Sequence, residues 1–374
     1  MSLQQPLVIA SSMLTTILVA QALRCIEELA DKDDTGRVTK LSHWLTDPYL
    51  PIEGQRNIAA WIVDAATKHK DPITELKFCE RTLFQAVIRS TVLFRRKTTK
   101  DDIGQIAEPV PLAFESEVGF RDGFRDVLDR KLSASMLKDV GKKYGRAKRW
   151  EKFREVAGCE IENKEDILYT EGVEIIPFRF GSARRDVANE LNWAGLRFVF
   201  PFLKDTINEE SITMVSNGVT LILEDAHYFA RYYFGLKHMH DDTFQLINHS
   251  VVNRMHFLQR FDMDDQGRHL VTLKYAPDTP EENKVSREVL HMHLALGSVI
   301  HAYGGYTNLE WEENEIDEQK VRVKFLRLRQ SMTPLAGAFP SGNQQRWTDL
   351  LVKKLYEVAL MEGMLERIQN VGRG

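Results

Sequence analysis

The sequence predicts a mainly α-helical protein of two lobes, with minor β hairpins and an arm at each terminus. Three observations support this fold class. The chain has 374 residues, which exceeds the usual size of one domain. It is 43% hydrophobic and 28% charged, as expected of a folded globular protein. Most of its apolar residues recur with helical spacing, and turn-forming residues separate the periodic segments.

The first part of the chain is predicted to be an extended arm followed by a helical lobe. The arm is assigned to 1–12, and apolar periodicity predicts a helix from about 11 to 30, which ends at the polar sequence DKDDTGR. The sequence KTTKDDIGQIAEPVP at 97–111 has the composition of an exposed loop. The N-terminal lobe is assigned to 13–200. Its other helical patterns occupy 55–69, 75–93, 116–136 and 135–157.

Strand signals are confined to two places. The segment ILYTEGVEIIPFRF at 167–180 is rich in β-branched and aromatic residues, which predicts a strand or short hairpin. Two apolar runs flank the turn DDQG at 264–267, which predicts a second hairpin. Between these places, helical patterns occupy 182–203 and 210–235. The second pattern is apolar on most faces, as in a central core helix.

The C-terminal part is divided into a lobe at 201–340 and a separate helix or arm at 341–374. The sequence GAFPSGNQQ at 337–345 combines glycine, proline and polar residues, which predicts a hinge. The last helix could then move as a unit. The helices of this part are predicted at 280–303, 313–330 and 344–370.

A basic stretch, GKKYGRAKRWEKFR at 141–154, is the clearest functional signal. Seven of the thirteen residues after its first glycine are Lys or Arg, in a chain whose net charge is only −4. On the helix predicted at 135–157, Ala147, Trp150, Phe153 and Ala157 share one side and form a candidate buried stripe. The cations would then face water. They would form either an ordinary solvated surface or a surface that binds phosphates.

Other basic clusters favour the second interpretation. They lie at 94–100, 178–186 and 320–330, and such segregation of charge is typical of a nucleic-acid groove. A phosphate backbone needs several cations along a line, and Trp150 or Tyr144 could stack on bases. A helix predicted to begin after 181–182 could add backbone N–H groups. The candidate RNA-binding residues are Arg95, Arg96, Lys97, Lys142, Lys143, Arg146, Lys148, Arg149, Lys152, Arg154, Arg179, Arg184 and Arg185.

The histidine-rich region offers an alternative from a different class. Nine of the eleven histidines lie between 227 and 301. Two Glu-x-x-His triplets, Glu224 with His227 and Glu288 with His291, place a carboxylate and an imidazole on one helical face, as in di-iron carboxylate proteins. Satisfied histidines in a packed lobe are the competing explanation, because two partner glutamates on other helices cannot be assigned. The alternative function would be a metal-dependent oxidoreductase.

No other motif indicates catalysis or a cofactor. The sequence contains no phosphate-binding glycine motif and no nucleophile elbow. In the calcium-like sequence DMDDQG at 262–267, the twelfth position of the loop would be Leu273 rather than the required Glu. The three widely spaced cysteines form neither a disulfide framework nor a zinc motif. We therefore expect neither an enzyme nor a cofactor-binding protein.

The uncharged segment at 7–23 has two interpretations. It approaches the length of a signal sequence or membrane anchor, but MSLQQP ahead of it carries no Lys or Arg, and its Ser and Thr residues interrupt the apolar run. A buried N-terminal helix is the preferred interpretation. We expect a protein that is neither secreted nor bound to a membrane.

The layout as a whole resembles the nucleoproteins of non-segmented negative-strand RNA viruses, in particular those of mymonaviruses. The matching features are the apolar N-terminal arm, the basic clusters near the presumed junction of the lobes, and the detachable C-terminal helix. The resemblance implies a sequence-nonspecific protein that holds single-stranded RNA by its phosphates. It also implies homo-oligomers or filaments joined through terminal arms, which encapsidate a viral genome in the virion and in the host cytoplasm or nucleus. A helical capsid-like protein without nucleic-acid contacts is the remaining alternative.

Overall fold

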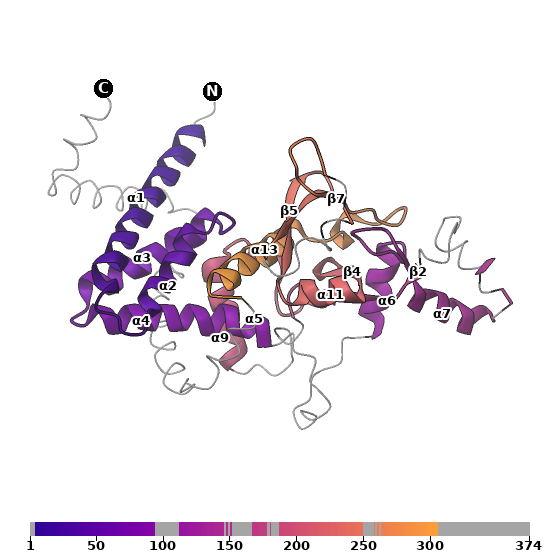
Figure 1. Ribbon diagram of the computed structural model, residues 1–374, viewed down its shortest axis with the longest axis horizontal. Helices are drawn as coiled ribbons and strands as arrows, with labels where there is room; N and C mark the ends of the chain where they lie inside the picture. Colours follow the sequence, from indigo (N-terminus) through magenta and orange to yellow (C-terminus); the bar gives the residue numbers. More distant parts are fainter. Residues whose placement is uncertain are drawn as a thin grey trace. The chain divides into compact units, whose positions relative to one another are not determined.

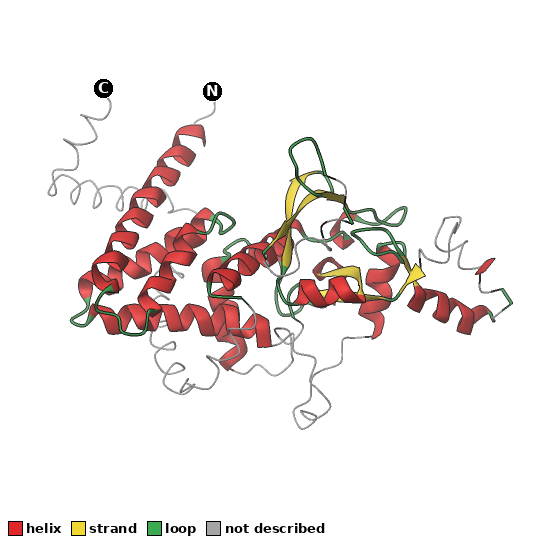
Figure 2. Cartoon of the chain, in the orientation of Figure 1, coloured by secondary structure: helices red, strands yellow, loops and turns green. Residues whose placement is uncertain are grey.

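The structure of the protein is a computed structural model, and the described part is mainly α-helical, which confirms the predicted fold class (Figures 1 and 2). The chain groups into two compact units, 1–316 and 317–374, and every described residue belongs to the first. The predictions at 313–330, 337–345 and 344–370 therefore lie outside the described residues. These are 4–93, 112–145, 147–148, 150–151, 167–177, 180, 187–249, 258, 260–261 and 263–305.

Consecutive helices form the N-terminal part, and α1 packs along α3 and α2. The first helix begins at Gln4, so the predicted extended arm at 1–12 is wrong for residues 4–12. A proline in the first turn of a helix is tolerated because its missing N–H has no intrahelical partner there, and Pro6 occupies such a position. The elements are α1 (Gln4–Ala30), α2 (Arg37–Thr46), α3 (Ile52–Lys68), α4 (Pro72–Leu83), the π-helical turn η1 (Phe84–Arg89) and α5 (Ser90–Leu93).

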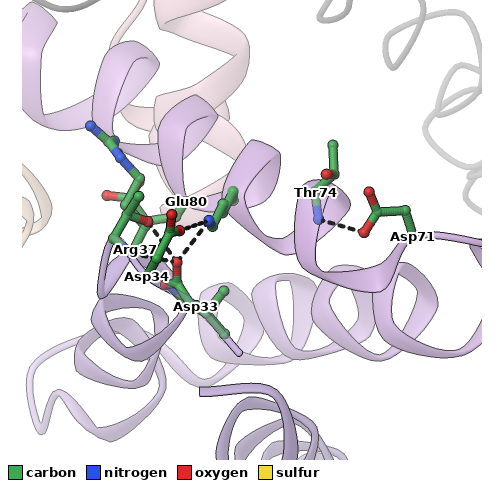
Figure 3. Close-up of polar contacts among 9 residues, drawn as sticks. Asp33, Asp34, Arg37, Asp71, Thr74 and Glu80 are labelled. Carbon is green, nitrogen blue, oxygen red and sulfur yellow. Dashed lines mark hydrogen bonds and ion pairs between the residues drawn. The ribbon is translucent and has the colours of Figure 1, made fainter. Parts of the chain in front are cut away.

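Acidic side chains fix the start of α2 and α4 (Figure 3). Asp33 accepts hydrogen bonds from the backbone N–H groups of Thr35 and Val38, at 3.0 and 2.7 Å, and pairs with Lys77 of α4. Burial raises the pKa of Asp33, but these hydrogen bonds outweigh it and hold the pKa well below its usual range. Asp71 caps α4 by accepting from the N–H of Thr74 at 3.2 Å.

Helix α9 (Val187–Val199) belongs with these N-terminal helices, because it packs on α3 and η1. Asn57 of α3 donates a hydrogen bond to the carbonyl of Phe198 at 2.8 Å, and Trp61 contacts the ring of Phe198 edge-on. The approach of the backbones is closest at Gly54, where a Cβ atom would lie 2.0 Å from the carbonyl oxygen of Val199. Only glycine fits at this crossing.

Replacing Gly54 with alanine is expected to lower the free energy of unfolding by about 3 kcal/mol, because the added methyl group would push the α9 backbone away. Gly119 of α6 provides the matched control, since its Cβ would meet the ring of Phe124 at an ordinary 3.5 Å. Gly119→Ala should be neutral or stabilising by helix propensity. Urea unfolding of both variants checks this, and equal stabilities would contradict the close contact.

The middle of the chain folds against elements that follow residue 215. Strand β3 (Thr170–Glu174) pairs antiparallel with β4 (Gly218–Ile222), and α6 (Leu112–Arg121) and α11 (Leu223–Ala230) both contact this pair. The contacts therefore cross the predicted lobe boundary at 200. The remaining short elements are β1 (Leu132–Ser133), α7 (Ala134–Tyr144), β2 (Ile167–Leu168), α10 (Leu203–Thr206) and the 3-10 turns η5 (Val215–Asn217) and η6 (Glu281–Asn283).

The prediction of one helix at 210–235 is wrong, because this segment forms β4, the short helix α11 and the first residues of the next strand, which begins at Phe234. All five residues of β4 are buried, so the strand lacks alternation and its apolar run resembles that of a core helix. The predicted strand at 167–180 is confirmed by β2 and β3, although β3 pairs with β4 rather than within a local hairpin.

A three-stranded antiparallel sheet completes the described part, in the order β5 (Phe234–His240), β6 (Thr243–Asn248), β7 (Leu270–Thr272). The predicted turn at 264–267 is confirmed, since Gly267 has a φ of 72° and its N–H donates to the carbonyl of Asp264 at 2.9 Å. Helix α13 (Arg287–Ala302) packs on β5 and confirms the helix predicted at 280–303 from residue 287 onward. Beyond its end, Tyr303 accepts a hydrogen bond from Trp44 of α2 at 2.9 Å.

Candidate nucleic-acid interface

Helix α7 carries the first part of the basic stretch and begins directly after a strand. Strands β1 and β2 pair in parallel, with Leu132 opposite Ile167 and Ser133 opposite Leu168. Helix α7 follows at Ala134 and also contacts β3, so the strand pair and the helix form one connected piece (Figure 1).

The described cations of this piece face solvent. In α7, Leu137 is buried, whereas Lys138 and Lys142 are exposed. These two lysines are four residues apart and therefore lie one above the other on the same face of the helix. Lys148, in the turn that follows α7, is also exposed. The two lysines of the helix face, together with Lys148 beyond the helix end, offer positive charge to the phosphates of a bound strand.

The helix predicted at 135–157 is interrupted after Tyr144. Gly145 has a φ of 82°, a left-handed conformation that ends an α-helix, and Trp150 and Glu151 are again helical. The predicted buried stripe is wrong at Ala147, which is exposed, while Trp150 is half-buried. Tyr144 is 40% exposed at the end of α7, so its ring is more accessible than that of a core anchor.

The structure places only part of the predicted RNA-binding set. Lys142 and Lys148 are described as exposed, and Lys143 lies on α7. The predicted helix start at 181–182 and the cluster at 320–330 lie outside the described residues. The same holds for Arg95, Arg96, Lys97, Arg146, Arg149, Lys152, Arg154, Arg179, Arg184 and Arg185.

Two residues near this surface were missed by the sequence analysis. Lys138 lies outside the stretch at 141–154, but its spacing of four from Lys142 could have revealed it. Tyr169 follows β2 and is 65% exposed. No local signal could have identified it, because its place beside α7 depends on the pairing of β1 with a strand more than thirty residues later.

The four residues of the metal-site alternative are not brought together as a ligand set. His291 contacts the carbonyl of Tyr49 at 2.7 Å and its ring stacks on Phe202. Glu288 accepts a hydrogen bond from Ser286, the cap of α13, at 3.1 Å. Glu224 and His227 are exposed on α11. Across the described ranges there is no group of three or more His, Cys, Asp or Glu that could hold a metal ion.

Two other histidines of this region are half-buried and stack on each other. The rings of His249 and His301 stack with centroids 5.8 Å apart, and Gly297 leaves room for His249 on α13. Burial, with the neighbouring His301, lowers the pKa of His249 to about 3, and burial also lowers the pKa of His301. Both rings are therefore neutral at pH 7 and take part in packing, so they add no positive charge to the protein.

A group of acidic side chains, Asp126, Asp129 and Asp225, interacts electrostatically at the start of α11. Asp225 is fully buried, forms an ion pair with Arg260, and its Oδ1 atom has no hydrogen-bond partner among the described residues. Burial raises the pKa of Asp225 to about 6, although Arg260 opposes this shift. Burial and the charge of Asp129 raise the pKa of Asp126 to about 7. These carboxyl groups titrate near neutral pH and couple stability to pH.

Comparisons of the chain with protein-family models, with curated proteins and with solved structures found no match. Of the helices that the structure describes, none is long and apolar enough to cross a membrane.

Proposed function

We propose that the protein binds single-stranded RNA without sequence preference. The observation that carries the proposal is the exposure of Lys138 and Lys142 on one face of α7, with Lys148 exposed in the turn beyond the helix and Tyr144 40% exposed at its last residue. Cations along a line neutralise a phosphate backbone, and an accessible aromatic ring offers a base a surface on which to stack. Neither contact depends on the identity of the base.

The resemblance to viral nucleoproteins extends this proposal to a protein that coats a viral genome as a homo-oligomer. The surface of α1 supports self-association, because Met13 and Ile17, one turn apart, are both exposed on a helix that is uncharged over most of its length. Exposed apolar side chains that adjoin one another are typical of contacts between subunits.

Removing two of the described cations tests RNA binding. The variant Lys142→Ala/Lys148→Ala is expected to bind a short labelled oligouridine about tenfold more weakly at low salt. The slope of log K against log salt should also become shallower by about 1.4, which corresponds to two phosphate contacts. Fluorescence anisotropy over a range of salt concentrations measures both quantities.

A matched control variant shows whether the loss of affinity comes from the α7 lysines themselves or only from the general loss of positive charge. Lys32→Ala/Lys204→Ala removes two exposed lysines elsewhere, at the end of α1 and on α10. This variant should keep the wild-type affinity. If both double variants lose affinity equally, the α7 face is not the site, and if the wild-type protein does not bind RNA at low salt, the proposed function is wrong.

Electron microscopy of the purified protein, with and without ribonuclease, tests the coating of RNA. Filaments that collapse after ribonuclease treatment are expected. Shells that survive the treatment would instead support the capsid-like alternative.

A further inference from the structure

We propose that Tyr169 is a stacking platform for a base of the bound single strand. The inference rests on the proposed function and adds to it a stacking contact between a protein side chain and a base. The ring is 65% exposed, whereas a tyrosine without a ligand usually covers its apolar body with protein.

The strand register places Tyr169 beside the start of α7. Ser133 lies opposite Leu168 in the parallel pair, so the next residues along the two chains are Ala134, the first of α7, and Tyr169. Lys138 follows one helical turn after Ala134, and Lys142 follows one turn later. The backbone of Tyr169 therefore lies beside the start of the helix that carries Lys138 and Lys142, and we expect one strand to contact the exposed ring and these cations.

The backbone around Tyr169 is held on three sides. Its carbonyl accepts a hydrogen bond from the N–H of Leu223 at 3.1 Å, which ties it to the start of α11. The preceding residue pairs with β1 and the following residue, Thr170, pairs with Ile222 of β4. A ring on a fixed backbone loses little conformational entropy when a ligand binds, which favours its use as a contact.

The surroundings of the ring suit a base on one side and repel phosphate on the other. Leu223, whose backbone N–H binds the carbonyl of Tyr169, is also exposed and adds apolar surface near this residue. Two acidic residues, Glu171 of β3 and Glu224 of α11, lie in the strand and the helix that follow. The phosphates of the strand are therefore expected on the side of α7, with the base over Tyr169.

The substitution Tyr169→Ala tests the proposal in the full chain. Loss of one stacked base should weaken the binding of labelled oligouridine at least about fivefold. The salt slope should not change, because the ring carries no charge. Tyr169→Phe keeps the stacking surface and should bind as the wild-type protein does. An oligomer of the same length with abasic sites should bind the wild-type protein and Tyr169→Ala equally.

Phe120→Ala is the matched control, because Phe120 is 62% exposed on α6 and lies outside the helix that carries Lys138 and Lys142. It should leave the affinity unchanged. If Tyr169→Ala binds RNA as tightly as the wild-type protein, the stacking role is wrong while the proposed function stands. If Tyr169→Ala instead changes the oligomeric state and leaves RNA affinity intact, the ring contacts a protein. Absence of RNA binding by the wild-type protein would overturn both proposals.

Discussion

Replacing Arg121 with methionine is expected to lower the free energy of unfolding by about 3–5 kcal/mol, the usual cost of removing one partner from a buried ion pair. The guanidinium is almost fully buried and donates two hydrogen bonds to Asp122, at 2.8 and 2.9 Å. It also donates to the carbonyls of Val215 and Gly218, at 2.6 and 2.8 Å. Without these donors, the charge of Asp122 and two backbone oxygens remain buried and poorly paired. Thermal and urea unfolding measure the loss.

Arg287 provides the control for this substitution. Its ion pair with Asp242, at 3.5 Å, lies at the surface, where such pairs contribute between about 0 and 1 kcal/mol. Arg287→Met should therefore unfold almost as the wild-type protein does. A small loss for Arg121→Met, similar to that for Arg287→Met, would mean that the network around Asp122 does not form in solution.

The substitution Arg260→Met should have a pH-dependent effect on stability. In the unfolded chain, Asp225 ionises near its usual pKa of about 3.9, whereas burial raises the pKa of Asp225 to about 6 in the folded protein. The folded protein therefore holds this proton more tightly. The resulting stability is fully present below about pH 4 and is lost as the pH rises through 6. Above pH 6, Arg260 is the cation that compensates the buried charge.

Loss of Arg260 should consequently cost about 2–4 kcal/mol near pH 8 and less than about 1 kcal/mol near pH 4.5, where Asp225 is protonated. Denaturant unfolding at the two pH values measures the difference. The double variant Arg260→Met/Asp225→Asn removes both charges and should recover most of the loss near pH 8. An equal loss at both pH values would contradict the assignment of the charge to Asp225.

The sequence was sufficient for those elements whose signal is local. Helix α13 has a capping serine at Ser286 and a clear apolar period, and the turn at 264–267 has its glycine at the position that needs a positive φ. In contrast, β4 was mistaken for helix because both of its faces are buried. The start of α1 at Gln4 is harder to predict, because Pro6 favours an extended arm in the sequence although the first turn of a helix accepts proline.

The candidate site shows the same limit. The charge run predicted that Lys142 and Lys148 would face solvent, since a row of cations is costly to bury. The sequence does not predict the break at Gly145, because the helical spacing of apolar residues continues on both sides of this glycine. Tyr169 depended on strand pairing between distant segments, and a single sequence contains no direct record of such a contact.

The packing of α9 on α3 affects how the chain folds as it is synthesised. Helix α5 ends at Leu93, and α9 begins only at Val187. At the usual rate of translation, about 5 to 20 s pass between these two points. During this time, the surfaces around Gly54 and Trp61 that α9 covers are open to water and to other chains. The nascent N-terminal helices are thus a candidate substrate for chaperones until residue 199 has left the ribosome.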